Sequence, residues 1–192
     1  MAEKIERQGL TWRHCGVVFT CMVALFTCVA MIFICAGLCY RPVAAHFGCQ
    51  VSDVSFYITC VYIGSTIAPI PASWLFERMN PKVFFTLALC LTAIPYFFNS
   101  MWPSIQMMQA GGVVIGIGLA VLEYTMTAGI LSRWFHTNYG TVIGLSFACT
   151  GAGGIVWNLV GQHILGPDLT GWATLYQLYA VIMFVACLIC IL

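Results

Sequence analysis

The sequence predicts an all-α membrane protein with six transmembrane helices. Of its 192 residues, 61% are hydrophobic and only 7% are charged, and the mean hydropathy is +0.96. A soluble domain of this composition would expose large apolar surfaces to water. The apolar residues also gather in six long stretches with short polar gaps between them. Because lipid offers the backbone no hydrogen-bonding partner, each stretch is expected to be a helix.

The six stretches follow a short amino-terminal segment, residues 1–15, and make up one domain over residues 16–192. A hydrocarbon core of about 30 Å takes about 20 helical residues to cross. The predicted spans cover residues 16–40, 54–76, 83–98, 107–131, 141–165 and 175–192. Spans one to three and four to six would form two three-helix units of inverted topology, because an odd number of crossings turns the second unit over. Since the chain ends inside its sixth apolar stretch, we expect it to be part of a longer protein.

The basic residues predict the orientation of the chain. Six of the seven Lys and Arg residues lie at the amino terminus or in alternate gaps, and only Arg41 lies on the other side. The six are Lys4, Arg7, Arg13, Arg78, Lys82 and Arg133. Under the positive-inside rule they mark the cytoplasmic side of a plasma or inner membrane, with the amino terminus inside. The net charge of +1 offers no basic surface for nucleic acid.

Polar residues recur on one face of the second span. At about 100° per residue they fall in a narrow stripe, which consists of Ser55, Thr59, Tyr62, Thr66, Pro69 and Ser73. Such a stripe faces either a neighbouring helix, through hydroxyl hydrogen bonds, or a water-filled pathway. Pro69 and Pro71 are expected to kink the cytoplasmic half of this helix.

Glu123, in the fourth span, is the only ionisable residue deep within a predicted span. Its face of the helix also carries Gly112, Gly116, Ala120 and Thr127. A charge in lipid would cost a few kcal/mol, so the carboxyl group should face the bundle interior or a cavity. Two interpretations remain open: a protonated structural acid that donates one hydrogen bond, or a group that exchanges a proton or contacts a substrate during transport. Burial without a nearby cation favours the neutral form in both.

The fifth span carries small residues on one side and predicts a close helix crossing. These residues are Gly140, Gly144, Ala148 and Gly151, followed by Gly153 and Gly154. Asn158 shares this side and is a candidate for substrate contact.

Most of the eleven cysteines lie within predicted spans, where they are expected to be small apolar packing residues. Cys39 and Cys49 flank the first external gap and could form a disulfide. No Ser/His, Cys/His or metal-binding set converges on one membrane face, so we expect neither an enzyme nor a metal or cofactor site.

The cytoplasmic gap after the second span reads Ser73-Trp-Leu-Phe-Glu-Arg-Met-Asn-Pro-Lys82. It resembles the loop signature of the major facilitator superfamily, G-x-L-x-D-R-x-G-x-[RK], at the place where that family carries it. Leu75, Arg78 and Lys82 match the signature, and Glu77 substitutes a like charge. Ser73 and Asn80 stand where the signature has glycine.

A second passage is similar to the fourth-to-sixth helix region of the oxalate/formate antiporter and monocarboxylate transporter branch of that family. The residues that carry the likeness are Gly116, Gly118, Tyr124, Arg133-Trp-Phe135, Tyr139-Gly140, Gly144, Gly151 and Gly171-Trp172. Ala173 replaces the arginine usual after Gly-Trp, and Tyr139 replaces the basic residue usual before glycine. The resemblance covers nearly the whole chain, as the first six of the family's usual twelve helices.

The resemblance implies a secondary transporter that moves a small organic solute, a mono- or dicarboxylate, by alternating access with proton coupling or anion exchange. Its partners would be the solute, protons, the lipid bilayer and a second six-helix half, covalently joined or as a separate chain. The expected pathway residues are Glu123, Tyr124, Thr127, Tyr62, Thr59, Thr66 and Asn158, and the expected cytoplasmic gate residues are Glu77, Arg78, Lys82 and Arg133. The alternatives are a drug or metabolite exporter of the same family and a non-transporting six-helix scaffold or accessory subunit.

Overall fold

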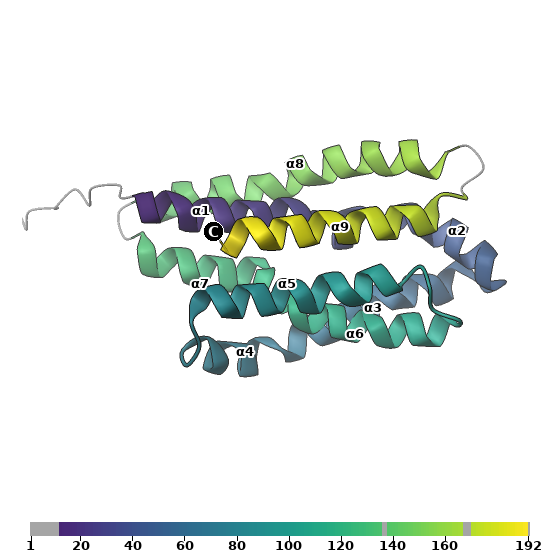
Figure 1. Cartoon of the computed structure of the whole chain (residues 1–192), viewed down its shortest axis with the longest axis horizontal. Helices are drawn as coiled ribbons and strands as arrows, with labels where there is room; N and C mark the ends of the chain where they lie inside the picture. Colours follow the sequence, from purple (N-terminus) through teal and green to yellow (C-terminus); the bar gives the residue numbers. More distant parts are fainter. Residues whose placement is uncertain (1–11, 136–137, 167–169, 192) are drawn as a thin grey trace, which may run out of the picture.

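The helices of this protein run side by side along one long axis (Figure 1). The computed structural model describes residues 12–135, 138–166 and 170–191, and every regular element in these ranges is helical. Lys4 and Arg7, which the sequence assigns to the cytoplasmic side, lie outside the described residues.

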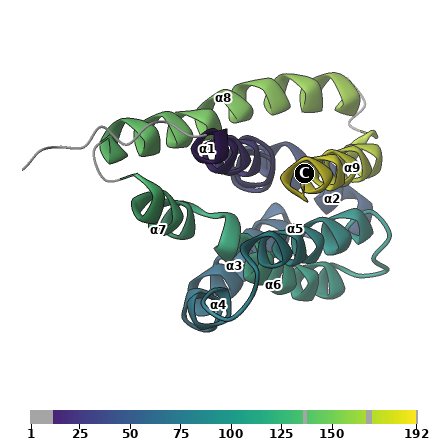
Figure 2. The same cartoon turned by 60° about the vertical axis from the view of Figure 1, so that its left-hand side comes forward.

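The helices form six successive segments that run in alternate directions, as Figures 1 and 2 show from two sides. The first segment contains α1 (Trp12–Ala24), the π-helical η1 (Leu25–Ile34) and α2 (Gly37–Phe47). The second contains α3 (Val51–Ile67) and α4 (Pro69–Phe76), and the third is α5 (Pro81–Phe98). The fourth contains α6 (Ile105–Leu122) and α7 (Tyr124–Trp134), the fifth is α8 (Tyr139–Leu165), and the sixth is α9 (Trp172–Ile191).

The protein is a membrane protein with several helices long and apolar enough to cross a bilayer. Among the described residues, three stretches meet this condition alone: His14–Ile34, Ile105–Trp134 and Tyr139–Leu165. The bent pair α3 and α4 meets it as one span. The helices α5 and α9 are apolar over the shorter stretches Lys82–Phe98 and Trp172–Ala186. Six crossings therefore remain a prediction.

The first segment differs from its predicted span, which ends at residue 40. The helix continues to Phe47 and includes Arg41, whose side chain is exposed. The helix can extend beyond the predicted span because a long basic side chain near the end of a span can reach the polar interface, so its charge does not end the helix. The helix ends instead at Gly48, which has a φ of 62° and donates its N–H to Ala44.

The kink predicted in the second segment is confirmed. The axes of α3 and α4 differ by 45° at a break just before Pro69. The Ala68 N–H still donates to the Gly64 carbonyl at 3.1 Å. The helix therefore bends at the proline while this backbone N–H keeps its hydrogen bond.

The fourth segment, predicted as a span over residues 107–131, is interrupted at a single residue. The helix α6 ends at Leu122, and Glu123 adopts an extended ψ of 172° before α7 begins. The backbone of Glu123 keeps its bonds on both sides: its N–H donates to Leu119 at 2.9 Å, and its carbonyl accepts from Thr127 at 3.1 Å. No proline or glycine marks this break in the sequence, so residue types alone do not reveal it.

The glycine face of α6 packs directly on α3. A Cβ atom on Gly116 would collide with the Val61 carbonyl and lie 3.0 Å from the Gly64 Cα. A Cβ on Gly112 would lie 3.0 Å from the ring of Tyr57. The small face predicted for the fourth span is therefore a helix crossing at backbone distance.

A second close crossing joins α8 to η1, as the sequence predicts, through Gly153 and Gly154. A Cβ on Gly153 would collide with the Phe26 carbonyl, and one on Gly154 would lie 2.8 Å from the side chain of Ile34. In contrast, no atom lies within 4 Å of the Cβ positions of Gly140, Gly144 and Gly151. Small residues occupy more than one face of α8, so their presence did not identify the packed face.

Three of the four largest helix contacts are related by a two-fold pattern, whereas the contact of α5 with α6 has no counterpart of similar size. The second segment packs on the fourth through α3 and α6, and the fifth packs on the first through α8 and η1. If segments one, two and three are exchanged with segments four, five and six, the contact of the second with the fourth segment becomes the contact of the fifth with the first. The same exchange maps the contact of α5 with α9, segments three and six, onto itself. This is the packing expected of two inverted three-helix units.

Buried cysteines fill small spaces between the helices. Cys28, Cys35 and Cys39 lie in the main core, at most 4% exposed. The disulfide considered for Cys39 and Cys49 is absent, since both are free thiols. For these residues the packing interpretation is confirmed.

The close crossing of α6 with α3 predicts that replacing a glycine with alanine affects stability strongly inside the crossing and weakly outside it. Replacing Gly116 with Ala should destabilise the protein by about 1–3 kcal/mol, because the methyl group collides with the backbone of α3. The matched change Gly144→Ala should have little effect, because its Cβ would enter open space. Denaturant titration of both variants in the same detergent micelles would measure this, and equal unfolding midpoints would contradict the crossing.

Candidate functional site

Glu123 lies at the break between α6 and α7, beside α3. Its side chain is partly buried and lies within hydrogen-bonding reach of the Ser65 hydroxyl. Ser65 is itself 5% exposed, and its hydroxyl donates to the Tyr62 carbonyl at 3.3 Å. The carboxyl group therefore lies near a hydroxyl of the neighbouring helix, at a point where the helical backbone is interrupted.

The polar stripe of the second segment lies largely on the exposed side of its helix. Thr59 and Thr66 are exposed, and Tyr62 is 52% exposed. The side of α3 that packs inward carries Tyr57, Val61 and Gly64 instead. The side chains of Thr59 and Thr66 are therefore open to water, lipid or a partner outside the described residues.

One aromatic contact connects this stripe to the first segment. The rings of Tyr62 and Phe33 stack, with centroids 4.8 Å apart and planes 13° from parallel. The Thr66 hydroxyl donates to the Tyr62 carbonyl at 2.7 Å. The Tyr62 carbonyl therefore accepts hydrogen bonds from two hydroxyl groups, those of Ser65 and Thr66. Thr66 belongs to the polar stripe and Ser65 lies near Glu123, so Tyr62 connects the stripe with the surroundings of Glu123.

Tyr124 and Thr127 follow Glu123 in α7 and have different environments. Tyr124 is 40% exposed, and its ring meets Phe147 of α8 edge to face at 4.8 Å. Thr127 is 1% exposed, and its hydroxyl oxygen has no hydrogen-bonding partner. A buried hydroxyl without a partner is costly, so this position is suited to a polar group supplied from elsewhere.

Asn158 does not join the other expected pathway residues. Its side-chain amide donates to the Gly154 carbonyl of its own helix at 2.8 Å. It stands eleven residues after Phe147 in α8, roughly 16 Å along the helix axis. Glu123, Tyr124 and Tyr62 therefore form the core of the candidate site, and Asn158 lies nearer the other end of the bundle.

The expected gate residues lie together at one end of the bundle, where α4, α5 and α7 meet the loops. The guanidinium of Arg133 lies 4.0 Å from the carboxylate of Glu77, and both side chains are more than 60% exposed. Arg78 stacks over the ring of Trp74 at 3.9 Å. The backbone N–H of Lys82 is capped by the side chain of Asn80 at 3.1 Å.

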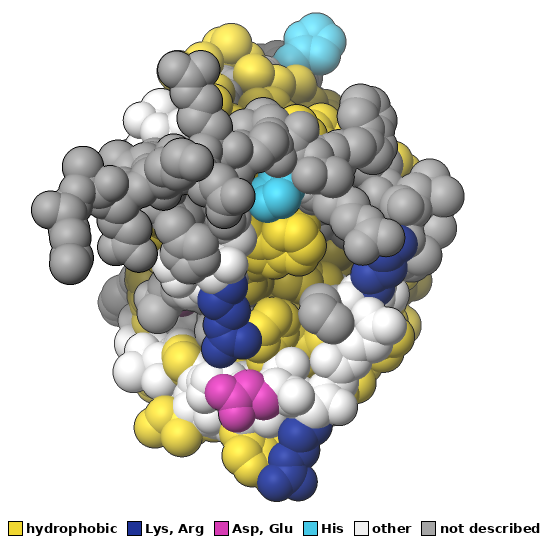
Figure 3. All heavy atoms as spheres, turned by 90° about the vertical axis from the view of Figure 1, so that its left-hand side faces the viewer, with side chains coloured by type: hydrophobic (Ala, Val, Ile, Leu, Met, Phe, Trp, Pro, Cys, Tyr) yellow, Lys and Arg dark blue, Asp and Glu magenta, His cyan; other side chains and the backbone are white. Residues whose placement is uncertain are grey.

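Figure 3 looks at this end and shows basic and acidic side chains with hydrophobic side chains between them. Arg41 belongs to α2, which lies toward the opposite end in Figure 1. Within the described part of the chain, the sequence-based separation of basic residues is therefore present. The ion pair of Glu77 and Arg133 connects two helices of this chain, and such exposed pairs contribute at most about 1 kcal/mol.

Sequence reasoning missed Ser65, Phe33 and Phe147 as neighbours of the candidate site. Ser65 stands next to the predicted stripe, and its partner became evident only with the packing of α3 on α6. Phe33 and Phe147 lie among many aromatic residues, and the sequence has no signal that separates them from packing residues.

The described residues contain no cluster of three or more His, Cys, Asp or Glu side chains that could hold a metal ion. The chemistry available at the candidate site is that of one carboxyl group, hydroxyl groups and aromatic rings. Such groups bind by hydrogen bonding and stacking, and the carboxyl group can accept and release a proton.

Comparison with known proteins adds the family. Over 131 residues the chain is 30% identical to the MFS-type transporter opdF of Penicillium oxalicum, covering 65% of this chain and 30% of that protein. It is 26% identical over 140 residues to the nitrite extrusion protein of Bacillus subtilis, covering 73% and 34%. It is 28% identical over 118 residues to the probable transporter MCH2 of Saccharomyces cerevisiae, covering 59% and 24%.

These alignments span at most 34% of the length of these curated relatives. Residues 13–192, nearly the whole chain, match the Major Facilitator Superfamily. With helices throughout, several spans and a loop that resembles the family signature, the chain belongs to the major facilitator superfamily of membrane transporters, which is not a family of enzymes.

Proposed function

We propose that this chain is the amino-terminal six-helix half of a secondary transporter for a small organic anion, a mono- or dicarboxylate. Residues 16–192 form the half, with residues 1–15 and the loops that carry Arg78 and Arg133 on the cytoplasmic side. A second six-helix half, in the same polypeptide or a separate chain, completes the pathway. Transport proceeds by alternating access and is coupled to protons or to anion exchange.

The placement of Glu123 is the observation that carries this proposal. A carboxyl group inside a membrane span is costly and usually serves a function. Here it sits at a break in the helix, against a hydroxyl of α3 and one residue before the half-exposed Tyr124. Breaks of this kind occur in transporters where the backbone lines a binding cavity.

The exposed polar stripe of α3 supports a pathway on the same side of this half. Hydroxyl groups facing lipid gain nothing, so Thr59, Tyr62 and Thr66 are expected to line a water-filled space shared with the second half.

An anionic solute is favoured by two observations. The second passage of the sequence resembles carriers of carboxylates, and one relative is named for extrusion of nitrite, a small anion. An exporter of larger amphipathic compounds remains the second candidate, because the rings of Phe33, Tyr62, Tyr124 and Phe147 give the candidate site an aromatic surface.

Transport by the natural gene product, purified from its own membrane and placed in vesicles, tests the proposal. Its intact mass would show whether the second half is part of the same chain. Uptake of a radiolabelled carboxylate that competes with other small anions is the expected result. Competition only by apolar drugs would favour the exporter, and absence of any flux by the intact protein would favour a scaffold.

Glu123→Gln should abolish the dependence of the transport rate on pH. The amide keeps the size and hydrogen bonding of the carboxyl group but cannot exchange a proton. The measurement is initial uptake from acidic to neutral pH in vesicles. Asp53→Asn is the matched control, because this exposed acid only caps α3, where Asn also serves. A Glu123→Gln variant that keeps the normal pH profile would contradict a proton-carrying role.

The pair of Glu77 and Arg133 should affect transport much more than stability. Alanine at either position should change the free energy of unfolding by less than about 1 kcal/mol, because both side chains are exposed. As gate residues, they should show coupled effects on the uptake rate in a double-mutant cycle. Strictly additive effects of the two substitutions on uptake would exclude a shared role in the gate.

A further inference from the structure

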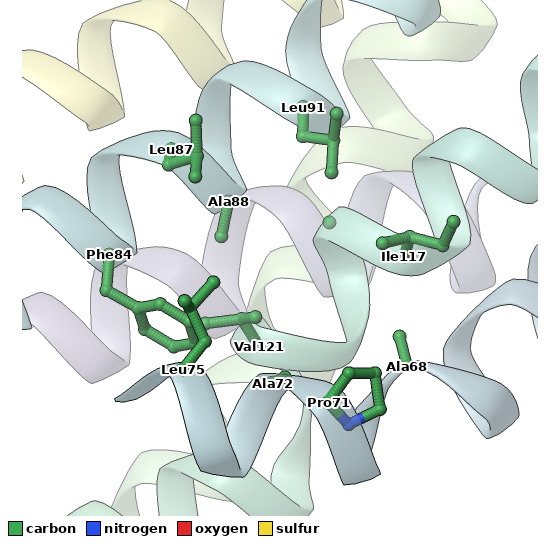
Figure 4. A pocket seen from close by; sticks show the side chains of 11 residues that line it. Ala68, Pro71, Ala72, Leu75, Phe84, Leu87, Ala88, Leu91, Ile117 and Val121 are labelled. Carbon is green, nitrogen blue, oxygen red and sulfur yellow. The ribbon is translucent and has the colours of Figure 1, made fainter. Parts of the chain in front are cut away.

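A hydrophobic pocket of about 160 Å³ lies between α4, α5 and α6, away from the candidate site. Figure 4 shows its walls: Pro71 and Ala72 of α4 below, Leu87 and Leu91 of α5 above, and Ile117 of α6 to the right. Every lining residue is apolar. The bend before Pro69 separates α4 from the direction of α3, and the pocket occupies the space beside this bend.

The pocket opens on a surface that is apolar far beyond its own walls. Leu87 is 51% exposed, and around it Ile70 is 82%, Trp74 56% and Val83 54% exposed. In a membrane protein such side chains face lipid, because water would not tolerate an apolar surface of this extent. An apolar pocket of this kind does not hold water, whereas an apolar cavity of about 150 Å³ is large enough to take up benzene. Its occupant is therefore a hydrocarbon group.

The position of the pocket along α5 indicates where this group comes from. The wall residues of α5 run from Phe84 to Leu91, beginning two residues after Lys82. From Phe84 to Leu91 the helix rises roughly 10 Å, which is about a third of a hydrocarbon core of about 30 Å. The pocket and the exposed apolar surface at its mouth, together called the groove, therefore fit within one leaflet and begin near its polar edge.

The mouth of the groove carries the groups typical of a membrane interface. Trp74 is half-exposed, and the guanidinium of Arg78 lies 3.9 Å over its ring. Lys82 follows in the first turn of α5. Tryptophan and basic side chains at this depth interact with lipid headgroups, and basic groups attract anionic ones. The nearby acid, Glu77, is paired with Arg133.

We propose that this groove binds one acyl chain of an anionic phospholipid, whose phosphate lies at Arg78 and Lys82. The chain fills the space between Leu75, Leu87 and Ile117 and supports α4 in its bent position. The apolar walls of this site belong to α4, α5 and α6, whereas the pathway residues Thr59, Tyr62 and Thr66 lie on α3. Arg78 and Lys82, which the sequence assigns to the cytoplasmic gate, lie at the polar end of the groove.

Photo-cross-linking with a phospholipid that carries a diazirine in its acyl chain tests the proposal. The purified protein is placed in vesicles of phosphatidylcholine with or without phosphatidylglycerol, and adducts are mapped by mass spectrometry. Leu87 and Val181 of α9 are matched in exposure, 51% and 52%, but only Leu87 lines the groove. Labelling at Leu87 should exceed that at Val181, and equal labelling would overturn the proposal even without any variant.

Filling the groove should remove the excess labelling. Ala68→Leu places a larger side chain where Ala68 lines the pocket in Figure 4, and labelling of Leu87 should fall to the level of Val181. Ala152→Leu, at an exposed position of α8, is the control and should leave the labelling unchanged. Undiminished labelling of Leu87 in a folded Ala68→Leu variant would contradict the groove as the binding site.

The headgroup contact is tested separately. Phosphatidylglycerol probes should label Leu87 more than phosphatidylcholine probes, and the double variant Arg78→Gln, Lys82→Gln should remove this preference. Equal labelling by both lipids in the unchanged protein would refute recognition of an anionic headgroup. Protein-to-protein cross-links through α4 and α5 in place of lipid adducts would show a second copy in the groove and would overturn the proposal.

Discussion

The structure depends on one constraint: every backbone N–H and carbonyl group inside the membrane needs a hydrogen-bonding partner within the protein, because lipid offers none. Three of the six segments are interrupted, and each interruption keeps backbone bonds across it. At the end of η1 the Cys35 N–H donates to Ala30, and before α4 the Ala68 N–H donates to Gly64. At Glu123 both the N–H and the carbonyl are bonded. The helices can therefore change direction, and expose a carboxyl group, without leaving these backbone groups unpaired in the membrane.

The bent helices are held in place by contacts that only glycine allows. Gly116 against Gly64, and Gly153 against Phe26, bring two pairs of helices together at backbone distance. These pairs are exchanged by the two-fold relation between the first three and the last three segments. The interruptions follow this relation only in part. The first and fourth segments both break past their midpoints in the direction of the chain, but the bend of the second segment has no counterpart in the continuous helix α8. The candidate site thus lies at the break of the fourth segment, which corresponds to the break of the first.

Much of this arrangement could be predicted from the sequence, because lipid imposes it through composition. Apolar stretches located the helices, and the prolines located the bend before α4. The packed face of the fourth segment followed from the spacing of Gly112, Gly116 and Glu123. The break at Glu123 and the packed face of α8 could not be predicted, since the first has no helix-breaking residue and the second has glycines on several faces. The neighbours Ser65, Phe33 and Phe147 depend on the packing of distant segments, which the pattern of a single helix does not encode.

The π-helical segment η1 has a consequence for the length of the chain. A π-helix contains more residues per turn than an α-helix, and π-bulges inside α-helices correspond to added residues. Loss of one residue between Leu25 and Ile34 could therefore be absorbed by a return to α-helical winding. Loss of one residue in α6 could not be absorbed in this way, because α6 is already α-helical. It would rotate the following part of the helix by about 100° and move Gly116 away from α3. The first segment can thus vary in length during evolution where the fourth cannot.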